Sequence, residues 1–255
     1  MTHTASYASL KGKRVFVTGG GSGIGESIVA AFAAQGATVA FVDIAREASE
    51  ALCARLAAQG LPAPLFRHCD INDIAALQAT IAELAAEVGD FDVLVNNAAN
   101  DQRHEVEAVS SAYWDACIGV NQKPMFFTCQ AVLPGMKRRG GGAIINMSSI
   151  SFHAKGAGYP VYATTKAAVI GLTRSMAREL GPHGIRVNTV TPGWVMTQRQ
   201  LDLWVDDAAR AEIAKSQCLP GLLAPNDIAA MVLFLAADDS AMCTAQEFIV
   251  DAGWV

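Results

Sequence analysis

The chain has 255 residues, of which 52% are hydrophobic and 17% are charged, and its formal net charge is -5. This composition indicates a compact globular protein with a mildly acidic surface, and it argues against nucleic acid as a partner. The six cysteines are scattered, without a CxxC pair or a nearby His cluster, so we expect no metal and no disulfide framework, as in a cytoplasmic protein. Residues 1–14 hold no apolar segment and no later stretch gives about 18 uncharged apolar residues in a row, so we expect no membrane association.

Short apolar or β-branched runs alternate along the chain with longer segments of helical periodicity. The runs cover residues 14–18, 37–43, 63–70, 91–97, 142–148, 185–191 and 246–252. The segments between them carry apolar residues at three- and four-residue spacing, which is typical of helices with one buried face. This alternation predicts an α/β doubly wound (Rossmann) fold in one domain, 1–255, with a seven-stranded parallel sheet covered on both faces. In that architecture ligands bind beyond the carboxyl ends of the strands.

The first predicted strand runs directly into a glycine-rich turn, TGGGSGIG, at residues 18–25. Gly19 permits a tight turn, Gly23 lets a pyrophosphate approach the backbone, and Gly25 allows the following helix to pack closely. The start of that helix presents free N–H groups to phosphates. The order of strand, glycines and helix predicts a dinucleotide site, and an ordinary glycine loop is the alternative.

Asp43 ends the second predicted strand, about 20 residues past the glycines, where a carboxylate can accept hydrogen bonds from ribose hydroxyls. The same carboxylate repels a 2′-phosphate, and neither Ser22 nor Ile44 supplies a basic group for one. We therefore expect NAD as the cofactor. Asp43 could instead be the N-cap of a helix that begins near Arg46, which would leave the choice of cofactor open.

Asp70 ends the third predicted strand. With Ile71 it could frame the adenine of the cofactor. Alternatively, Asp70 could cap the helix that follows Asn72.

The stretch YPVYATTKA, residues 159–167, holds two tyrosines and one lysine. Pro160 disfavours helical geometry at Tyr159 and suits a first helical turn, so we expect a helix to start between the two tyrosines. Tyr162 and Lys166 then share one face of that helix. The ammonium should lower the phenol pKa, as should an oxidised nicotinamide, so that Tyr162 can take a proton from an alcohol. A solvated helix face is the alternative for this pair taken alone.

Two further polar features lie near strand ends. Ser148 and Ser149 end the strand before this helix, where either hydroxyl could hold the reacting oxygen. Asn121 lies in a helical pattern that Pro124 should disturb, because proline has no N–H for the carbonyl of Val120. Such a turn can hold a water, or it can be a kinked packing helix.

Together, TGGGSGIG, the NNAAN of 96–100, Asn121, Ser149, Tyr162, Lys166 and the PGWVMT of 192–197 resemble the classical short-chain dehydrogenase/reductase family over nearly the whole chain. The resemblance implies the strand order 3-2-1-4-5-6-7, a homotetramer formed through two long central helices, and a catalytic tetrad of Asn121, Ser149, Tyr162 and Lys166. It also implies that Asn97 and Ala98 lie near the adenosine ribose and that Pro192, Gly193, Val195 and Thr197 border the nicotinamide. Ser22, Ile24, Ile44, Tyr162 and Lys166 complete the predicted cofactor site. Where the family pattern has glycine, this chain has Ala99, for which we expect only a local shift.

The sequences KGKRVFVTGGGSGIG, NNAANDQRH, PGWVMTQRQ, the QCL of 217–219 and residues 231–255 resemble bacterial NAD-dependent aldose 1-dehydrogenases, the group that contains D-xylose, L-arabinose, L-fucose and D-galactose dehydrogenases. That likeness implies oxidation of the anomeric C1 hydroxyl of an aldose to the aldonolactone. Tyr162 would remove the O1 proton while the C1 hydride passes to the nicotinamide, Ser149 would hold O1, Lys166 would bind the nicotinamide ribose, and Asn121 would position a water.

For the sugar site we expect contacts from Ser149, Tyr162, Asn100, His153, Tyr159, Trp194 and Gln200, with Gln102, Arg103 and His104 as further candidates. Residues 194–223 are expected to form a substrate lid. The alternatives are a dehydrogenase of the same kind acting on a polyol, a hydroxysteroid or a 3-oxoacyl substrate, and a non-catalytic NAD-binding sensor.

Overall fold

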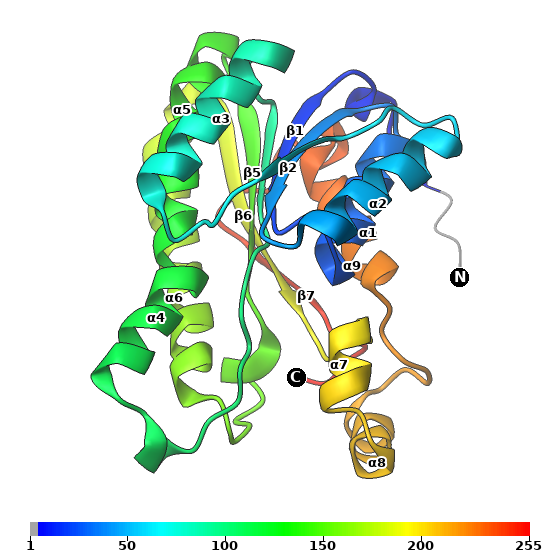
Figure 1. Cartoon of the computed structure of the whole chain (residues 1–255), viewed down its shortest axis with the longest axis vertical. Helices are drawn as coiled ribbons and strands as arrows, with labels where there is room; N and C mark the ends of the chain where they lie inside the picture. The colour runs from blue at the N-terminus through cyan, green and yellow to red at the C-terminus, as the bar shows by residue number, and fades with distance from the viewer. Residues whose placement is uncertain (1–4) are drawn as a thin grey trace.

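The structure is a computed structural model that describes residues 5–255, in which seven strands form one parallel sheet in the order β3-β2-β1-β4-β5-β6-β7 (Figure 1). The first four residues of the N-terminal segment examined above lie outside the described residues. Both the predicted strand runs and the predicted strand order are confirmed. The strands are β1 (Arg14–Thr18), β2 (Thr38–Asp43), β3 (Leu65–His68), β4 (Val93–Asn96), β5 (Gly142–Met147), β6 (Ile185–Pro192) and β7 (Glu247–Val250).

Helices cover both faces of this sheet (Figure 1). On one face lie α1 (Gly23–Ala34), α2 (Arg46–Ala58) and α9 (Pro225–Ala236), and on the other lie α3 (Ile74–Val88), α4 (Ser111–Asn121), α5 (Lys123–Arg139) and α6 (Pro160–Leu180). Two short helices, α7 (Gln198–Leu203) and α8 (Asp207–Ser216), follow the end of β6. The 3₁₀ turns are η1 (Ala8–Leu10), η2 (Val106–Ala108), η3 (Ile150–Phe152), η4 (Gly181–His183) and η5 (Asp238–Ser240). Within residues 5–255, no helix combines the length and the hydropathy that a bilayer span needs.

Side chains of the sheet divide between two apolar cores. In β1, Val15 and Val17 belong to the cluster that includes Ile28 of α1, whereas Phe16 belongs to the cluster that includes Leu77 of α3. Successive side chains of a strand point to opposite faces, so a strand that is apolar throughout supplies both cores. Burial of each large side chain contributes about 1.5–3 kcal/mol, and this packing fixes where the strand ends lie.

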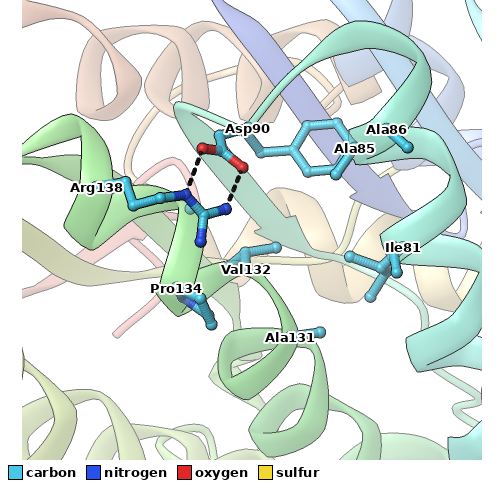
Figure 2. Close-up of a pocket in the computed structure, with 11 residues that line it drawn as sticks. Ile81, Ala85, Ala86, Asp90, Ala131, Val132, Pro134 and Arg138 are labelled. Atoms are coloured by element: carbon cyan, nitrogen blue, oxygen red, sulfur yellow. Dashed lines mark hydrogen bonds and ion pairs between the residues drawn. The ribbon is translucent and has the colours of Figure 1, made fainter.

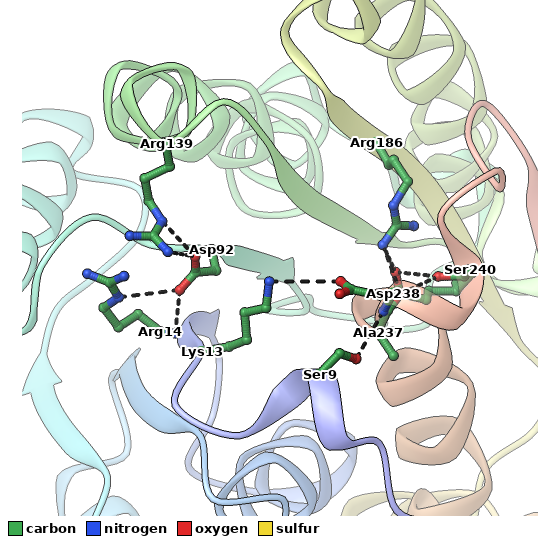
Figure 3. Close-up of polar contacts among 10 residues, drawn as sticks. Ser9, Lys13, Arg14, Asp92, Arg139, Arg186, Ala237, Asp238 and Ser240 are labelled. Carbon is green, nitrogen blue, oxygen red and sulfur yellow. Dashed lines mark hydrogen bonds and ion pairs between the residues drawn. The ribbon is translucent and has the colours of Figure 1, made fainter.

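Charged side chains tie the amino-terminal end of the sheet together (Figure 3). Asp92, which is 7% exposed, accepts hydrogen bonds from the Arg14 backbone N–H (2.8 Å) and from Arg139 Nε (2.7 Å). On the other side, Arg186 donates to the Ala237 carbonyl at 3.3 Å. A buried carboxylate is stable when both of its oxygens have partners, so these charges have a structural use.

A pocket between α3 and α5 lies at the same amino-terminal end (Figure 2). Its edge carries a bidentate ion pair in which Arg138 donates to Asp90 at 2.7 and 3.1 Å. This pair holds the pKa of Asp90 below its ordinary value, mainly through the hydrogen bond from Arg138. The residues predicted to be catalytic follow the opposite ends of the strands, so this pocket is not the predicted site.

Candidate active site

The polar residues predicted to be functional lie where β1, β4, β5 and β6 end. These four strands are neighbours in the sheet, and all of them run in the same direction. The loops that follow them therefore meet along one edge. The switch in strand order falls between β1 and β4, which is the place where doubly wound proteins bind ligands.

The glycine-rich turn has the tight geometry that its sequence predicts. Gly19 has a φ of +68°, which a residue with a side chain rarely adopts. A Cβ atom at Gly25 would lie only 1.8 Å from the Gly19 carbonyl oxygen, so the start of α1 can approach the turn only because residue 25 is glycine. Both assigned roles, the tight turn and the close helix packing, agree with these contacts.

Asn97 and Ala98 support this turn from the end of β4. The Asn97 side chain donates to the carbonyls of Gly19 (2.8 Å) and Thr18 (3.2 Å). The backbone N–H groups of Asn97 and Ala98 both lie within hydrogen-bond distance of Thr18 Oγ1, at 3.1 and 3.2 Å. Asn97 therefore uses its side chain to brace the turn.

The N-terminus of α1 is available to an anionic group. Ser22 is the N-cap of this helix, and within the part of the chain that the structure describes its side chain makes no capping bond. The first N–H groups of the helix are therefore not capped by the Ser22 hydroxyl. Ile24 lies in the same first turn. A Cβ atom at Gly23 would lie 3.2 Å from Thr197 Cγ2, which brings the segment after β6 to the glycine turn.

Asp43 faces the glycine turn. Its Oδ2 accepts a hydrogen bond from the Gly21 N–H and its Oδ1 accepts one from the Ala45 N–H, each at 2.8 Å. The alternative of an N-cap is wrong, because Ala45 holds the N-cap position of α2. Each carboxylate oxygen retains a further lone pair, and Ile44 beside it is 66% exposed.

Asp70 does not cap the helix that follows it. The N-cap of α3 is Asp73, whose side chain accepts a hydrogen bond from the Ala76 N–H. Asp70 Oδ1 instead accepts from the Asn72 N–H at 2.9 Å and is exposed, while Ile71 is 7% exposed. Their assignment to the adenine stays a prediction.

Tyr162 and Lys166 lie on one side of α6. The helix begins at Pro160 with Tyr159 as its N-cap, which is the start that the sequence predicts. Lys166 Nζ lies 5.6 Å from the centroid of the Tyr162 ring, and it donates to the Met147 carbonyl at 3.0 Å. The lysine is 1% exposed, so its amine belongs to the interior at the end of β5.

Burial changes the pKa values of these two side chains in opposite directions. It raises the pKa of Tyr162, and the charge of Asp101 adds to that effect, whereas a hydrogen bond with Ser149 lowers it. Burial lowers the pKa of Lys166 to about 8, and Asp101 opposes that change. The net pKa of the Tyr162 phenol is therefore raised and not lowered as predicted, because burial is the largest effect on it.

The two serines after β5 have different partners. Ser148 Oγ donates to the Lys166 carbonyl at 2.8 Å and is 4% exposed, so this hydroxyl is used inside the protein. Ser149 Oγ accepts from the Ser151 N–H at 3.2 Å and also contacts the Tyr162 phenol. Of the two, Ser149 is the serine that lies beside the reactive phenol.

Asn121 lies at the break between α4 and α5. The break falls at Gln122, just before Pro124, as the missing N–H of proline predicts. Asn121 is 0% exposed, its Oδ1 accepts from the Asn100 N–H (2.8 Å), and its Nδ2 donates to the Asn100 carbonyl (3.0 Å). The side chain therefore fixes the loop after β4.

Comparisons with known proteins agree with this arrangement. The family model described as Enoyl-(Acyl carrier protein) reductase matches residues 19–255. The chain is 52% identical to a D-xylose 1-dehydrogenase of Caulobacter vibrioides, over 98% of this chain and 99% of that protein. It is 48% identical to a probable galactose dehydrogenase of Rhizobium meliloti, over 98% of both chains. A 3-oxoacyl-[acyl-carrier protein] reductase of Brucella melitensis with bound NAD shares the structure with a TM-score of 0.89, at 31% identity over 100% of this chain and 98% of that chain.

The chain belongs to the short-chain dehydrogenase/reductase family. This membership makes it an oxidoreductase that uses a pyridine nucleotide. The residues of this short-chain dehydrogenase/reductase fit such a cofactor, because the glycine turn would clash with added side chains, the start of α1 has uncapped N–H groups, and Asp43 keeps free acceptor sites.

Residues after β6 close the same edge in this short-chain dehydrogenase/reductase. Gly193 packs against Asp251 so closely that a Cβ atom would lie 2.7 Å from the Asp251 Cα. Val195 is 4% exposed and pairs with Leu223, and Thr197 caps α7 by accepting from the Gln200 N–H at 3.3 Å. Pro192 ends β6 itself. Only Thr197 among them touches the glycine turn in these contacts.

Several residues that were predicted for the sugar site form hydrogen bonds with other parts of the protein. His153 Nε2 lies 2.9 Å from Glu247 Oε1, so its ring is held against β7. His104 Nδ1 lies 2.9 Å from the Tyr113 hydroxyl, and His104 Nε2 lies 3.3 Å from the Val161 backbone nitrogen at the start of α6. The Tyr113 hydroxyl also donates to the Gln102 carbonyl at 3.1 Å. Tyr159 is half-buried, and burial raises its pKa.

Asp101, which was not among the predicted site residues, bonds two side chains of α7. Its Oδ1 lies 3.2 Å from Arg199 Nε, and its Oδ2 accepts a hydrogen bond from Gln200 Nε2. Gln200 Oε1 in turn accepts from Trp194 Nε1 at 2.9 Å. The one available signal was its position directly after NNAAN, at a strand end.

Proposed function

We propose that the protein is an NAD-dependent dehydrogenase that oxidises the anomeric C1 hydroxyl of an aldose to the aldonolactone. The observation that carries this proposal is the half-buried Tyr162 phenol, which contacts the Ser149 hydroxyl and shares one side of α6 with Lys166. Identities of 52% and 48% to two sugar dehydrogenases over almost the full chain favour an aldose as the substrate.

In the proposed reaction, Ser149 and Tyr162 hold the O1 hydroxyl of the sugar and Tyr162 takes its proton. The bound cofactor supplies the hydride acceptor and a positive charge. Because burial raises the Tyr162 pKa, the phenol must first pass its own proton to solvent. The positive charge of the oxidised cofactor would favour this loss, as would the Lys166 ammonium, whose Nζ lies 5.6 Å from the centroid of the Tyr162 ring. Proton transfer by such a group typically contributes about 100- to 10,000-fold to the rate.

The preference for NAD over NADP rests on Asp43. Its carboxylate ends β2 and is fixed by the N–H groups of Gly21 and Ala45. A fixed negative charge beside the ribose repels a 2′-phosphate and accepts hydrogen bonds from free hydroxyls. Replacement of Asp43 by Asn should therefore reduce the discrimination between the two cofactors.

Residues 194–223 are proposed as the substrate lid, because α7 and α8 follow the end of β6 and α7 contacts Asp101 through Arg199 and Gln200. We also propose a homotetramer formed through α5 and α6 in the cytoplasm. All six cysteines are free, as reducing conditions require.

The experiment is a screen for NADH formation with aldoses, polyols, a hydroxysteroid and hydroxyacyl thioesters, each with NAD and with NADP at fixed pH. We expect aldoses with NAD to give the largest kcat/KM. Faster oxidation of any other class would reassign the substrate, and no turnover with any of them would favour a non-catalytic sensor.

A further inference from the structure

We propose that Asp101 is a specificity-determining residue that accepts hydrogen bonds from hydroxyls next to the reacting carbon of the sugar. The proposal rests on the aldose dehydrogenase function given above. It is carried by the loop after β4, which is bonded to Asn121 and from which this carboxylate bonds two side chains of α7.

The backbone beside Asp101 is fixed from the interior. Asn121, which is 0% exposed, bonds both the N–H and the carbonyl of the neighbouring Asn100. The backbone that precedes Asp101 is therefore fixed by Asn121, the last residue of α4. A side chain on such a support is held in place without paying a large entropic cost on binding.

The carboxylate of Asp101 has two hydrogen-bond partners and still has acceptor positions without one in these contacts. One oxygen is 3.2 Å from Arg199 Nε and the other accepts from Gln200 Nε2, while its side chain remains 31% exposed. An ionised carboxylate has about four acceptor positions, so about two remain after these contacts. Adjacent hydroxyls of a sugar are donors of the kind that such positions accept.

The charge of Asp101 also reaches the catalytic pair. It raises the pKa of both Tyr162 and Lys166, and the loop that carries Asp101 is bonded to Asn121 at the end of α4. A sugar whose O1 contacts Tyr162 then presents its next hydroxyls towards Asp101.

Two tryptophan rings lie against Arg103 of the same loop. The Arg103 guanidinium lies 5.4 Å from the Trp194 ring and 4.3 Å from the Trp204 ring, measured to their centroids. Trp194 is in turn bonded to Gln200, which bonds Asp101. Trp194 is therefore linked to the Asp101 carboxylate through Gln200.

The test compares Asp101→Asn with a matched control, Arg199→Ala, which removes one partner of Asp101 and leaves the carboxylate in place. Each variant and the wild type are assayed with the best aldose of the screen and with its deoxy analogues that lack one hydroxyl next to C1 or further along the ring. Circular dichroism melting checks that both variants fold.

We expect Asp101→Asn to raise the KM for the full aldose by about 10- to 100-fold, with the KM for NAD unchanged, because a hydrogen bond to a charged group is lost. For the deoxy sugar that lacks the recognised hydroxyl, the variant and the wild type should differ by less than about 3-fold, a small fraction of that change. Arg199→Ala should change the KM of every sugar by the same factor.

If Asp101→Asn and Arg199→Ala changed the KM of every sugar equally, the proposal would be overturned. Asp101 would then only hold α7 in place and would not recognise the sugar. An unchanged KM for the full aldose in Asp101→Asn would also overturn it while leaving the proposed function intact. Failure of the wild type to oxidise any aldose would overturn both together.

Discussion

Tyr162 and Lys166 show how strongly the interior controls the chemistry of single side chains. Tyr162 is half-buried and Lys166 is buried at the end of β5, and burial favours the neutral form of each. A neighbouring lysine is therefore not enough to make the phenol a base, because its own ammonium is destabilised in the same place. Added positive charge from the bound cofactor has to complete the activation.

The titration of Lys166 can be measured through stability. Its folded pKa of about 8 lies below the unfolded value of about 10.4, so between these values the unfolded chain binds more protons and the stability rises with pH. Relative to Lys166→Met, the wild type should gain about 2–3 kcal/mol in the free energy of unfolding between about pH 8 and about pH 10. Urea unfolding of both proteins across this range gives the difference, and a constant difference would show that Lys166 does not titrate there.

Gly25 offers a second residue-scale prediction. Alanine at this position would bring a methyl group into the Gly19 carbonyl, so α1 must move away from the turn, and both stability and NAD affinity should fall. The matched control is Gly171→Ala in α6, where a Cβ meets nothing within 4 Å and alanine should stabilise the helix by up to about 1 kcal/mol. Thermal melting and NAD titration compare the two variants, and equal behaviour would contradict the packing role of Gly25.

At the scale of elements, a buried polar network joins the central strands to α6, the helix that carries Tyr162. Asn146 of β5 accepts a hydrogen bond from Asn96 of β4 (2.9 Å) and donates to Thr173 of α6 (3.0 Å), and Thr189 of β6 bonds the same threonine at 2.8 Å. All four side chains are at most 2% exposed. The network sets the position of α6, and with it Tyr162, against the sheet.

Asn146→Ala should cost about 2–4 kcal/mol, because Asn96 and Thr173 each lose one hydrogen-bond partner away from water. A matched control is Gln78→Ala, which breaks an amide pair with Gln130 at the surface (3.0 Å) and should cost less than about 0.5 kcal/mol. Urea unfolding measures both. Similar costs for the two variants would mean that the buried network adds no more than a surface contact.

The elements themselves were predictable and the contacts between their loops were not. Seven apolar runs, the helix start at Pro160 and the break before Pro124 follow from local rules, and the structure has each of them. By contrast, Asp101 and Arg199 are 98 positions apart, and His153 and Glu247 are 94 apart. Such pairs depend on how two loops pack, which no local pattern specifies. The polar network did leave one signal, since Asn146 interrupts the otherwise apolar strand β5.

At the scale of the whole molecule, the sheet separates structural charges from reactive ones. Asp92 and its arginine partners tie the amino-terminal end, where the pocket edged by Asp90 and Arg138 also lies (Figures 2 and 3). The glycine turn, Tyr162 and Asp101 gather at the carboxyl ends of the strands. Charge pairs at the first end stabilise the frame, and groups with free acceptor or donor positions at the second end bind ligands.

The most direct test is the rate of NADH formation from the best aldose at saturating NAD, measured for the wild type and for Tyr162→Phe. The account predicts that the variant folds and binds NAD normally but loses about 100- to 10,000-fold in kcat, because the group that takes the O1 proton is gone. A variant with near-normal kcat would contradict the assignment of Tyr162 as the base.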